Sequence, residues 1–472
     1  MSLPDEVTQG VPPAADIVEA LRSGELRSLD LTKAYLDRIE RYDGAVRSYI
    51  TVCAETALVQ AAEADAALER GEPPRPLQGL PVALKDNIDT AGVRTTAGSR
   101  FFADTVPTAD SEVARRLREA GAVLLGKTVL HEFAFGATSQ NPHHGACRNP
   151  WDLDRVPGGS SGGSGAALGA DLTATALGTD TGGSVRIPAA LNGVSGLRPT
   201  SGRVSIRGVF PITWSFDTVG PMARSVTDVA ALLAILQGFD PADPSSIDRP
   251  PCEAVAATER GIEGMRLGVA TGYYQEDVDA EIVELVGEAG DVFERLGASV
   301  VDVDLPGASE VFEATNLIVR AEAYGIHQER LATQPELFGE DVRRRLLLGE
   351  QVTGADYGRY RDVGRVWRRN LELAFADLDA VLTPAAGTVA PRADESETIE
   401  TTRRLARLTY GFSTAKVPAL VVPCGFSSGG LPVGMQIVAP RWQEETLLSL
   451  GTAYQRETDW HLRRPELAAL AA

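Results

Sequence analysis

The chain has 472 residues, 43% of them hydrophobic and 23% charged, which is the balance of an ordinary globular protein with a large core. Its formal net charge of −20 argues against a nucleic-acid partner, because binding to phosphates favours clustered lysine and arginine. No apolar run approaches the roughly 18 residues of a membrane span, and the N-terminus lacks the features of a signal peptide. Four widely spaced cysteines form no CxxC pair, so we expect a cytoplasmic protein without a zinc or redox motif.

The first part of the chain predicts a layer of helices over residues 1–75. Apolar residues recur at helical spacing after Ser28, and an alanine-rich helix is expected over roughly 54–69. The first strand signal is the apolar run 80–84, which leads directly into Lys85. A lysine at the end of an apolar strand is a candidate functional group, although most lysines reach solvent.

A helix over 113–120 and a strand over 122–125 come next, and residues 121–128 match the phosphate-loop pattern GxxxxGK[ST]. We reject a phosphate site here, because the variable positions are Ala-Val-Leu-Leu, which is a buried-strand pattern. A helix, and not a strand, precedes the first glycine. The segment therefore predicts a helix, a turn and a strand.

Two glycine-serine segments follow, GGSSGG at 158–163 and GGS at 182–184. Glycine is used where the backbone takes a positive φ or approaches a ligand closely. Two such segments, each with a hydroxyl group, predict a pocket of backbone amides and serines, as acyl transfer requires. A short strand is expected over 174–177, and Ser184 lies near the start of a helix, where free amides favour a developing anion.

The remainder of the chain alternates helix and strand signals. Helices are expected over 217–237, 279–296, within 308–376 and over 444–456, and strands over 266–270, 299–304, 380–383, 419–422 and 433–438. Since no low-complexity linker divides the chain, we predict a single α/β domain, a large mixed β-sheet with helices on both faces. Its expected parts are the helical layer 1–75, a core at about 76–230, a variable substrate-pocket region at about 240–380 and the end of the sheet at 381–472.

Three features together resemble the amidase signature family of serine hydrolases: Lys85, GGSSGGSGAA at 158–167 and GTDTGGSVRIPAA at 178–190. The resemblance runs from about residue 30 to the end of the chain. It implies an α/β/α sandwich and a hydrolase that cleaves amide C–N bonds through a Ser-Ser-Lys triad and an acyl-enzyme. It also implies that no metal or organic cofactor is needed.

The resemblance further implies the role of each site residue. Ser184 would be the nucleophile, Ser160 a bridging serine in a cis peptide bond with the preceding glycine, and Lys85 the base. The amides expected to form the oxyanion hole are those of Thr181, Gly182, Gly183 and Ser184. The residues expected to line the substrate pocket are Ala134, Phe135 and Gly136.

Physical chemistry supports a lysine base independently. A serine hydroxyl is a weak nucleophile without an adjacent base, and none of the five histidines has a spacing that ties it to Ser184. A lysine becomes neutral near pH 7 only if its pKa falls by about three units, and burial acts in that direction. We therefore expect Lys85 to be buried.

The expected substrate is a small amide of apolar or aryl character. Aromatic residues at 312, 324, 357, 360 and 367 would line its pocket, or would simply pack between helices. Carbamates and esters present the same kind of carbonyl group and stay open as substrates. We expect no nucleic-acid or membrane partner, and the oligomeric state stays open, a homodimer included.

Two alternative functions are considered. The first is the glutaminase component of a glutaminyl-tRNA amidotransferase, its A subunit, which shares the core of the family. Such proteins carry an acidic residue, which holds the amino group of glutamine, about twelve positions before the proline that here is Pro418, whereas this chain has Ala406. The second is an α/β-hydrolase esterase with Ser160 as nucleophile, since 158–162 fits the pattern GxSxG. In that class a strand leads directly into the turn that carries the nucleophile, and the polar, proline-containing residues before 158 disfavour such a strand.

Overall fold

A computed structural model describes residues 12–395 and 398–466 of the chain. The strands of its main sheet are β1 (Tyr49–Val52), β2 (Pro81–Lys85), β3 (Val123–Thr128), β6 (Thr175–Thr179), β7 (Ser195–Arg198), β8 (Val219–Ala223), β9 (Arg266–Ala270), β10 (Ser299–Val303), β11 (Ala380–Pro384), β12 (Ala419–Phe426) and β13 (Pro432–Val438). They lie in the order β1-β3-β2-β6-β8-β7-β12-β13-β11-β9-β10. Strands β4 (Gln140–Asn141) and β5 (Gly145–Ala146) form a separate pair. The sheet is mixed, because β2 runs parallel to β3 and β6, whereas β8 runs antiparallel to β6 and β7.

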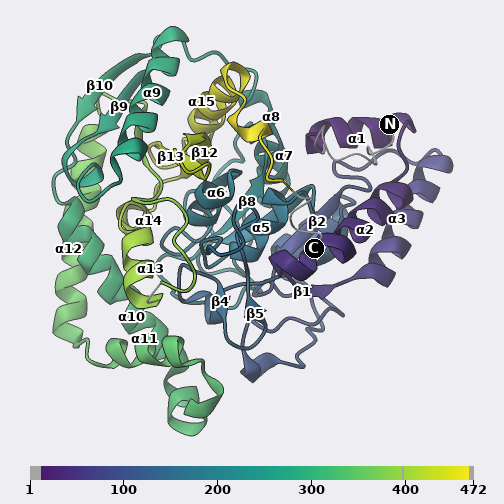
Figure 1. Cartoon of the computed structure of the whole chain (residues 1–472), viewed down its shortest axis with the longest axis horizontal. Coiled ribbons are helices and arrows are strands. Elements are labelled where there is room, and N and C mark those ends of the chain that lie inside the picture. Colours follow the sequence, from purple (N-terminus) through teal and green to yellow (C-terminus); the bar gives the residue numbers. More distant parts are fainter. Residues whose placement is uncertain (1–11, 396–397, 467–472) are drawn as a thin grey trace.

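The helices follow the predicted alternation with the strands. They are α1 (Ala14–Ser23), α2 (Ser28–Val46), α3 (Ala54–Glu69), α4 (Glu112–Glu119), α5 (Gly162–Gly169), α6 (Arg186–Asn192), α7 (Val226–Leu236), α8 (Ala254–Ala257), α9 (Ala280–Arg295), α10 (Ala308–Thr333), α11 (Glu340–Glu350), α12 (Gly354–Ala374), α13 (Thr398–Ala406), α14 (Tyr410–Ala415) and α15 (Glu444–Glu457). Helices α1, α2 and α3 lie at one end of the molecule, and α9 and α12 lie at the other (Figure 1). The large mixed sheet with helices confirms the predicted fold class.

Helices cover both faces of the sheet, as the contacts of two neighbouring residues of strand β12 show. Successive residues of a strand point to opposite faces. A Cβ built on Gly434 of β13 would contact both Ala190 of α6 and Val421, so α6 packs on the face of Val421. A Cβ on Gly451 of α15 would contact Leu420, so α15 packs on the opposite face.

One predicted helix begins later than expected. The sequence predicts a helix over 217–237, but residues Val219–Ala223 form β8, and α7 begins only at Val226. Ser225 caps this helix by accepting a hydrogen bond from the Asp228 amide at 3.0 Å. The apolar residues before the cap pair with β6 and β7 instead. Pro221, which has no amide hydrogen to donate, lies opposite Leu177 of β6 and outside the register with β7, where its missing hydrogen bond is tolerated.

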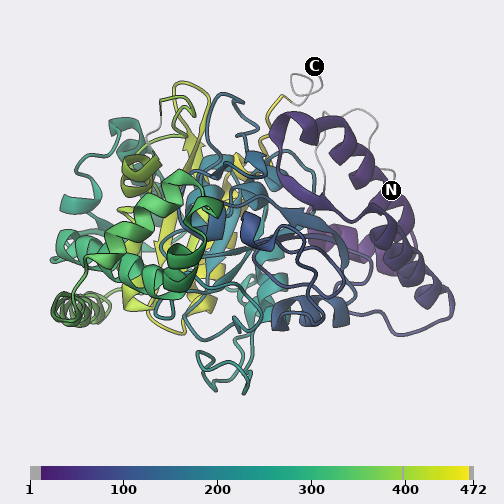
Figure 2. The same cartoon turned by 90° about the horizontal axis from the view of Figure 1, so that it is seen from below.

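Helices α10, α11 and α12 (green) pack together on the side of the molecule away from the N-terminal helices (Figure 2). Gly349 of α11 allows a close approach to α10, since a Cβ there would lie 2.1 Å from the carbonyl oxygen of Arg320. Trp367 of α12 donates a hydrogen bond from Nε1 to the Gly411 carbonyl of α14 at 2.7 Å. Among the residues that the structure describes, none of the helices is long and apolar enough to cross a membrane.

Candidate active site

Lys85 and Thr179 are the last residues of two neighbouring parallel strands. Leu84 of β2 lies opposite Leu177 of β6, so both strands end at the same edge of the sheet. Lys85 Nζ donates hydrogen bonds to Thr179 Oγ1 at 2.7 Å and to Ser160 Oγ at 2.7 Å. The sequence signals for the two strands thus account for the position of the lysine, while the contact with Thr179 has no signal in the sequence.

Ser160 lies in a loop that packs tightly against the segment 137–139. The peptide bond between Gly159 and Ser160 is cis, as the family resemblance implies. A Cβ on Gly159 would lie 2.8 Å from the Ala137 carbonyl carbon, so this close approach requires glycine. Ser139 Oγ accepts a hydrogen bond from the Gly162 amide at 3.0 Å, which ties the start of α5 to the same segment.

Lys85 is fully buried, as the chemistry of a lysine base requires. Burial lowers the pKa of Lys85 from its ordinary value to about 7, and the negative charges of Asp180 and Asp217 only partly oppose this effect. No carboxylate forms an ion pair with its ammonium group within the described residues. A substantial fraction of the Lys85 side chains is therefore neutral at pH 7.

Asp180 shapes the loop that leads to Ser184. Its carboxylate accepts hydrogen bonds from the backbone amides of Gly183 at 2.8 Å and Val185 at 3.2 Å. Gly183 has a φ of 128°, which side chains rarely adopt, and a Cβ there would lie 2.3 Å from Thr409 Oγ1. A Cβ on Gly182 would lie 2.0 Å from the ring of Tyr410, so the two glycines of TGGS are required by the backbone path and by close packing.

Two arginines hold Asp180 in place. Arg186 Nη2 and Arg198 Nη1 donate to Asp180 Oδ1 at 2.9 Å and 3.0 Å, and all three side chains are fully buried. Burial alone would raise the pKa of Asp180, but the positive charges of Arg186 and Arg198 hold it well below its ordinary value. Arg186 also donates to Gln436 Oε1 at 2.7 Å and to Ser413 Oγ at 2.8 Å, so this cluster joins the loop to β13 and α14.

The amides predicted for an oxyanion hole differ in what they contact. The Gly183 amide donates to Asp180 and is thereby committed to the loop itself. The amides of Thr181, Gly182 and Ser184 make no hydrogen bond with any residue in the described ranges. Three of the four predicted amides thus remain available to a ligand beside Ser184.

Thr181 is anchored from the other side of the site. Its hydroxyl donates to Asp217 Oδ1 at 2.6 Å, and the Asp217 carboxylate also accepts from the amides of Ile212 and Thr213. Burial raises the pKa of Asp217. The loop around Asp217 is in turn held by Glu322 of α10, which accepts hydrogen bonds from two backbone amides of the segment 214–215.

The two serine loops are joined by one backbone contact, since the Ser161 amide donates to the Ser184 carbonyl at 3.2 Å. Ser160 Oγ accepts from Lys85, whereas Ser184 Oγ makes no hydrogen bond with the described part of the chain. Ser184 is partly exposed and Ser160 is fully buried. Of the two hydroxyl groups, only that of Ser184 therefore faces a site that a substrate can enter.

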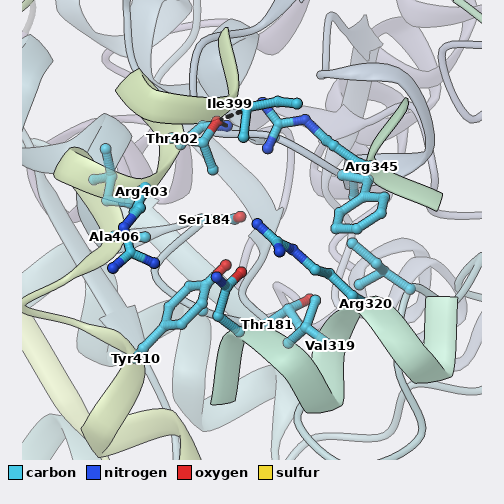
Figure 3. A pocket seen from close by; sticks show the side chains of 18 of the residues that line it. Thr181, Ser184, Val319, Arg320, Arg345, Ile399, Thr402, Arg403, Ala406 and Tyr410 are labelled. Atoms are coloured by element: carbon cyan, nitrogen blue, oxygen red, sulfur yellow. Dashed lines mark hydrogen bonds between the residues drawn. The ribbon is translucent and has the colours of Figure 1, made fainter. Parts of the chain in front are cut away.

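Ser184 opens into a pocket formed mainly by the segments 134–137 and 181–184 and by helices α10, α11, α13 and α14 (Figure 3). The pocket is lined by Ala134, Phe135, Gly136, Ala137, Thr181, Gly182, Ser184, Ile187, Ile212, Phe312, Asn316, Val319, Arg320, Arg345, Ile399, Thr402, Arg403, Ala406 and Tyr410. The predicted residues Ala134, Phe135 and Gly136 lie in its wall. Ala406, the position that distinguishes the glutaminase alternative, lies in the wall as well.

The pocket is less apolar than the sequence predicts. Phe135, Ile187 and Phe312 supply apolar wall, but three arginines from three different helices also line it. These arginines are Arg320, Arg345 and Arg403. No local motif marks them, because their helices are separate in the sequence and meet only in the fold.

Most of the aromatic residues considered for the pocket serve helix packing instead. Phe312 alone among them lines it. Tyr357 donates its hydroxyl to Glu322 Oε1 at 2.7 Å, and Tyr324 donates to Glu350 at 3.1 Å. Of the two alternatives considered for these positions, packing therefore holds at four of the five, since Tyr360 and Trp367 also pack in hydrophobic clusters of the helical layer.

The rejected phosphate-loop pattern is a buried strand, as predicted. Lys127 lies within β3, fully buried, and its Nζ donates to the Ile88 carbonyl and to Thr95 Oγ1, both at 2.6 Å. In the described part of the chain, no group of three or more His, Cys, Asp or Glu side chains could hold a metal ion.

Comparisons with known proteins agree with this architecture. The family model described as "Amidase" matches residues 30–448. The A subunit of the glutamyl-tRNA(Gln) amidotransferase from Moorella thermoacetica is 41% identical, over 96% of this chain and 98% of that protein. A solved chain with a TM-score of 0.91 is 34% identical, over 96% of this chain and all of that one; it belongs to a "vestigial protein complex" that "reveals the evolutionary origins of an s-triazine catabolic enzyme". The solved structure of the corresponding amidotransferase protein from Thermotoga maritima has a TM-score of 0.81 and 33% identity, over 95% of each chain. The chain therefore belongs to the amidase signature family, whose members act on amide C–N bonds.

Proposed function

We propose that this protein hydrolyses a small linear amide, with Ser184 as nucleophile, Ser160 as proton relay and Lys85 as base. The observation that supports this most strongly is the contact between the buried Lys85 Nζ and Ser160 Oγ at 2.7 Å. A pKa of about 7 allows the lysine to accept a proton and return it near neutral pH. The partly exposed Ser184 then meets the substrate.

In the first half of the reaction, Ser184 Oγ attacks the amide carbonyl carbon. Its proton passes to Ser160 Oγ while the proton of Ser160 passes to Lys85 Nζ. The hydrogen bond between the two serines forms when the substrate brings the hydroxyl groups into line. The amides of Thr181, Gly182 and Ser184 hold the negative oxygen of the tetrahedral intermediate.

Collapse of this intermediate breaks the C–N bond. The leaving nitrogen takes the proton from Lys85 through Ser160 and departs as a neutral amine or as ammonia. In the second half, water attacks the ester to Ser184, and its proton follows the same relay. The acyl group leaves as a carboxylic acid, and Ser184 regains its hydrogen. Esters and carbamates satisfy the same geometry, because each presents a carbonyl with a leaving group that Lys85 can protonate.

The relay predicts a particular pH dependence. The base form of Lys85 is required, so kcat/KM should rise about tenfold per pH unit below pH 7 and level off above it. The measurement is kcat/KM between pH 5 and 9 in buffers of constant ionic strength. A profile that keeps rising toward pH 10, the range of an ordinary lysine, would contradict the assignment of Lys85.

The comparisons support a second candidate, a glutaminase that supplies ammonia within a tRNA-dependent amidotransferase of several different chains. The curated relative from Moorella is 41% identical over almost the whole chain, and it bears that name. Against this, Ala406 stands in the pocket where the family resemblance leads us to expect an acidic side chain for the amino group of glutamine.

Ammonia release separates the two candidates. The protein alone would be incubated with butyramide, benzamide, monoamides of short dicarboxylic acids and free glutamine, with Ser184→Ala as the blank. We expect Ser184-dependent release from at least one small amide and little from glutamine. Preferred release from glutamine would support the second candidate. Release that persists in the Ser184→Ala variant would contradict both.

A further inference from the structure

We propose that the pocket selects amides that also bear a carboxylate, and that Arg320 binds this carboxylate. The inference rests on the proposed function of Ser184 and names the substrate class of that site. It concerns the three arginines of the pocket, which the hydrolytic relay does not use. The three arginines differ in whether an acidic side chain of the protein already pairs with them.

Two of the three arginines have acidic partners. Arg345 Nε donates to Asp341 Oδ1 at 3.0 Å, and its Nη2 donates to Thr402 Oγ1 at 3.0 Å. Arg403 forms a bidentate ion pair with Glu313 of α10. The positions of these two guanidinium groups are therefore fixed by the protein itself.

Arg320 has no such partner. Its guanidinium group forms no hydrogen bond or ion pair with any residue in the ranges that the structure describes. Burial lowers the pKa of Arg320 and the nearby positive charges of Arg345 and Arg403 act in the same direction, while Tyr410 and Glu313 act against them. A half-buried cation without a counter-ion of its own is unfavourable unless an anion joins it, so we infer that the site receives a negative charge.

The direction of the side chain fits this role. Arg320 extends from α10 into the pocket toward Ser184 (Figure 3). An acyl group held at Ser184 would thus direct its far end to Arg320. A planar guanidinium group matches a carboxylate with two parallel hydrogen bonds, and this geometry favours a carboxylate over a neutral group.

The apolar wall strengthens the contact. Val319, Ile212 and Phe312 line the pocket together with Arg320, so part of the wall around its guanidinium group is apolar. A charge-assisted hydrogen bond is stronger where the local dielectric constant is low. The contact with Arg320 is expected to tighten the binding of a carboxylate about tenfold to a hundredfold.

Protection of Ser184 from covalent labelling tests the proposal without the true substrate. The rate of labelling by a neutral fluorophosphonate would be measured with malonate, succinate, glutarate, inorganic phosphate or chloride at matched ionic strength. We expect at least one dicarboxylate to slow labelling of the wild-type protein more than phosphate or chloride does. In Arg320→Gln, the concentration needed for half protection should rise at least about tenfold, with Arg320→Lys in between.

Arg365→Gln is the matched control, because Arg365 is 73% exposed on α12 and pairs with Asp362 on the same helix. It should leave protection unchanged. The midpoint of thermal unfolding with the same anions provides a second readout that does not need a reactive serine. Equal protection and equal shifts in wild type and Arg320→Gln would overturn the proposal, as would an effect of phosphate alone.

Turnover separates this proposal from the proposed function. The ratio of kcat/KM for succinamate and for its neutral analogue butyramide should favour succinamate in wild type and fall at least about tenfold in Arg320→Gln. Efficient hydrolysis of butyramide with no preference for succinamate would refute the carboxylate site and leave the hydrolase intact. Absence of labelling at Ser184 would instead refute the hydrolase.

Discussion

Replacing Lys85 with methionine is expected to lower kcat by about three to four orders of magnitude, because it removes the group that accepts the proton of the nucleophile. Methionine keeps the length and the apolar stem of lysine, so the buried site stays filled. Ser184→Ala should lose at least as much activity. The measurement is kcat on the best amide of the panel, together with a circular-dichroism spectrum to show that each variant folds.

Lys85→Met is also expected to leave the free energy of unfolding undiminished at pH 7. Holding the pKa of Lys85 at about 7 costs about 4 kcal/mol at pH 7, relative to a lysine with an ordinary pKa in the unfolded chain. Since the folded pKa lies below the unfolded one, the wild-type protein gains stability as pH rises from about 7 toward 10. Lys85→Met removes this cost and loses two hydrogen bonds of about 1 kcal/mol each, so its free energy of unfolding should not fall.

Lys127 provides the matched control. It lies opposite Leu84 on the neighbouring strand and is equally buried, but its Nζ lies 3.7 Å from Asp86 Oδ1. Lys127→Met should destabilise the protein, because it leaves a buried carboxylate without its partner, while kcat of the folded protein stays within about tenfold. Equal losses of kcat in both lysine variants would show that Lys85 acts through structure alone.

Replacing Asp180 with asparagine is expected to cost about 3–5 kcal/mol of the free energy of unfolding. The change leaves Arg186 and Arg198 as buried cations without their common partner. It also weakens the hydrogen bond that holds the Gly183 amide, so activity should fall with stability. Urea denaturation at pH 7 measures the loss.

The pH dependence of this effect has a definite sign. Because the folded pKa of Asp180 lies well below its ordinary value, its contribution to stability is full above about pH 4 and is lost as pH falls further. Asp362→Asn is the control, since Asp362 is 62% exposed and should contribute less than about 1 kcal/mol. A loss below about 1 kcal/mol in Asp180→Asn would contradict the view that this cluster holds the nucleophile loop.

Regular elements with a clear period are predictable from the sequence. The alanine-rich helix α3 and strand β9 have the predicted limits, because one face or both faces of each are apolar over their full length. Strands β7 and β8 are not predicted, because Ser195–Arg198 is short and polar at both ends and Gly220-Pro221 resembles the start of a helix. Pairing with neighbours distant in sequence, and not local preference, makes them strands.

The catalytic part of the site is predictable because its residues belong to short segments with distinctive composition. Lys85 follows an apolar strand, and both serines stand in glycine-rich loops that the backbone path requires. The charge of the pocket is not predictable in this way. Arg320 and Arg345 have no local signal, and they converge only because α10 and α11 pack closely at Gly349.

Mapping the covalent adduct of a fluorophosphonate tests the central assignment most directly. Cleavage before aspartate separates the two serines, since Ser160 then lies in the peptide 154–170 and Ser184 in the peptide 180–216. The account predicts an adduct on 180–216, formed faster as pH rises toward 7 and much more slowly in Lys85→Met. An adduct on 154–170, or labelling that does not depend on Lys85, would contradict it.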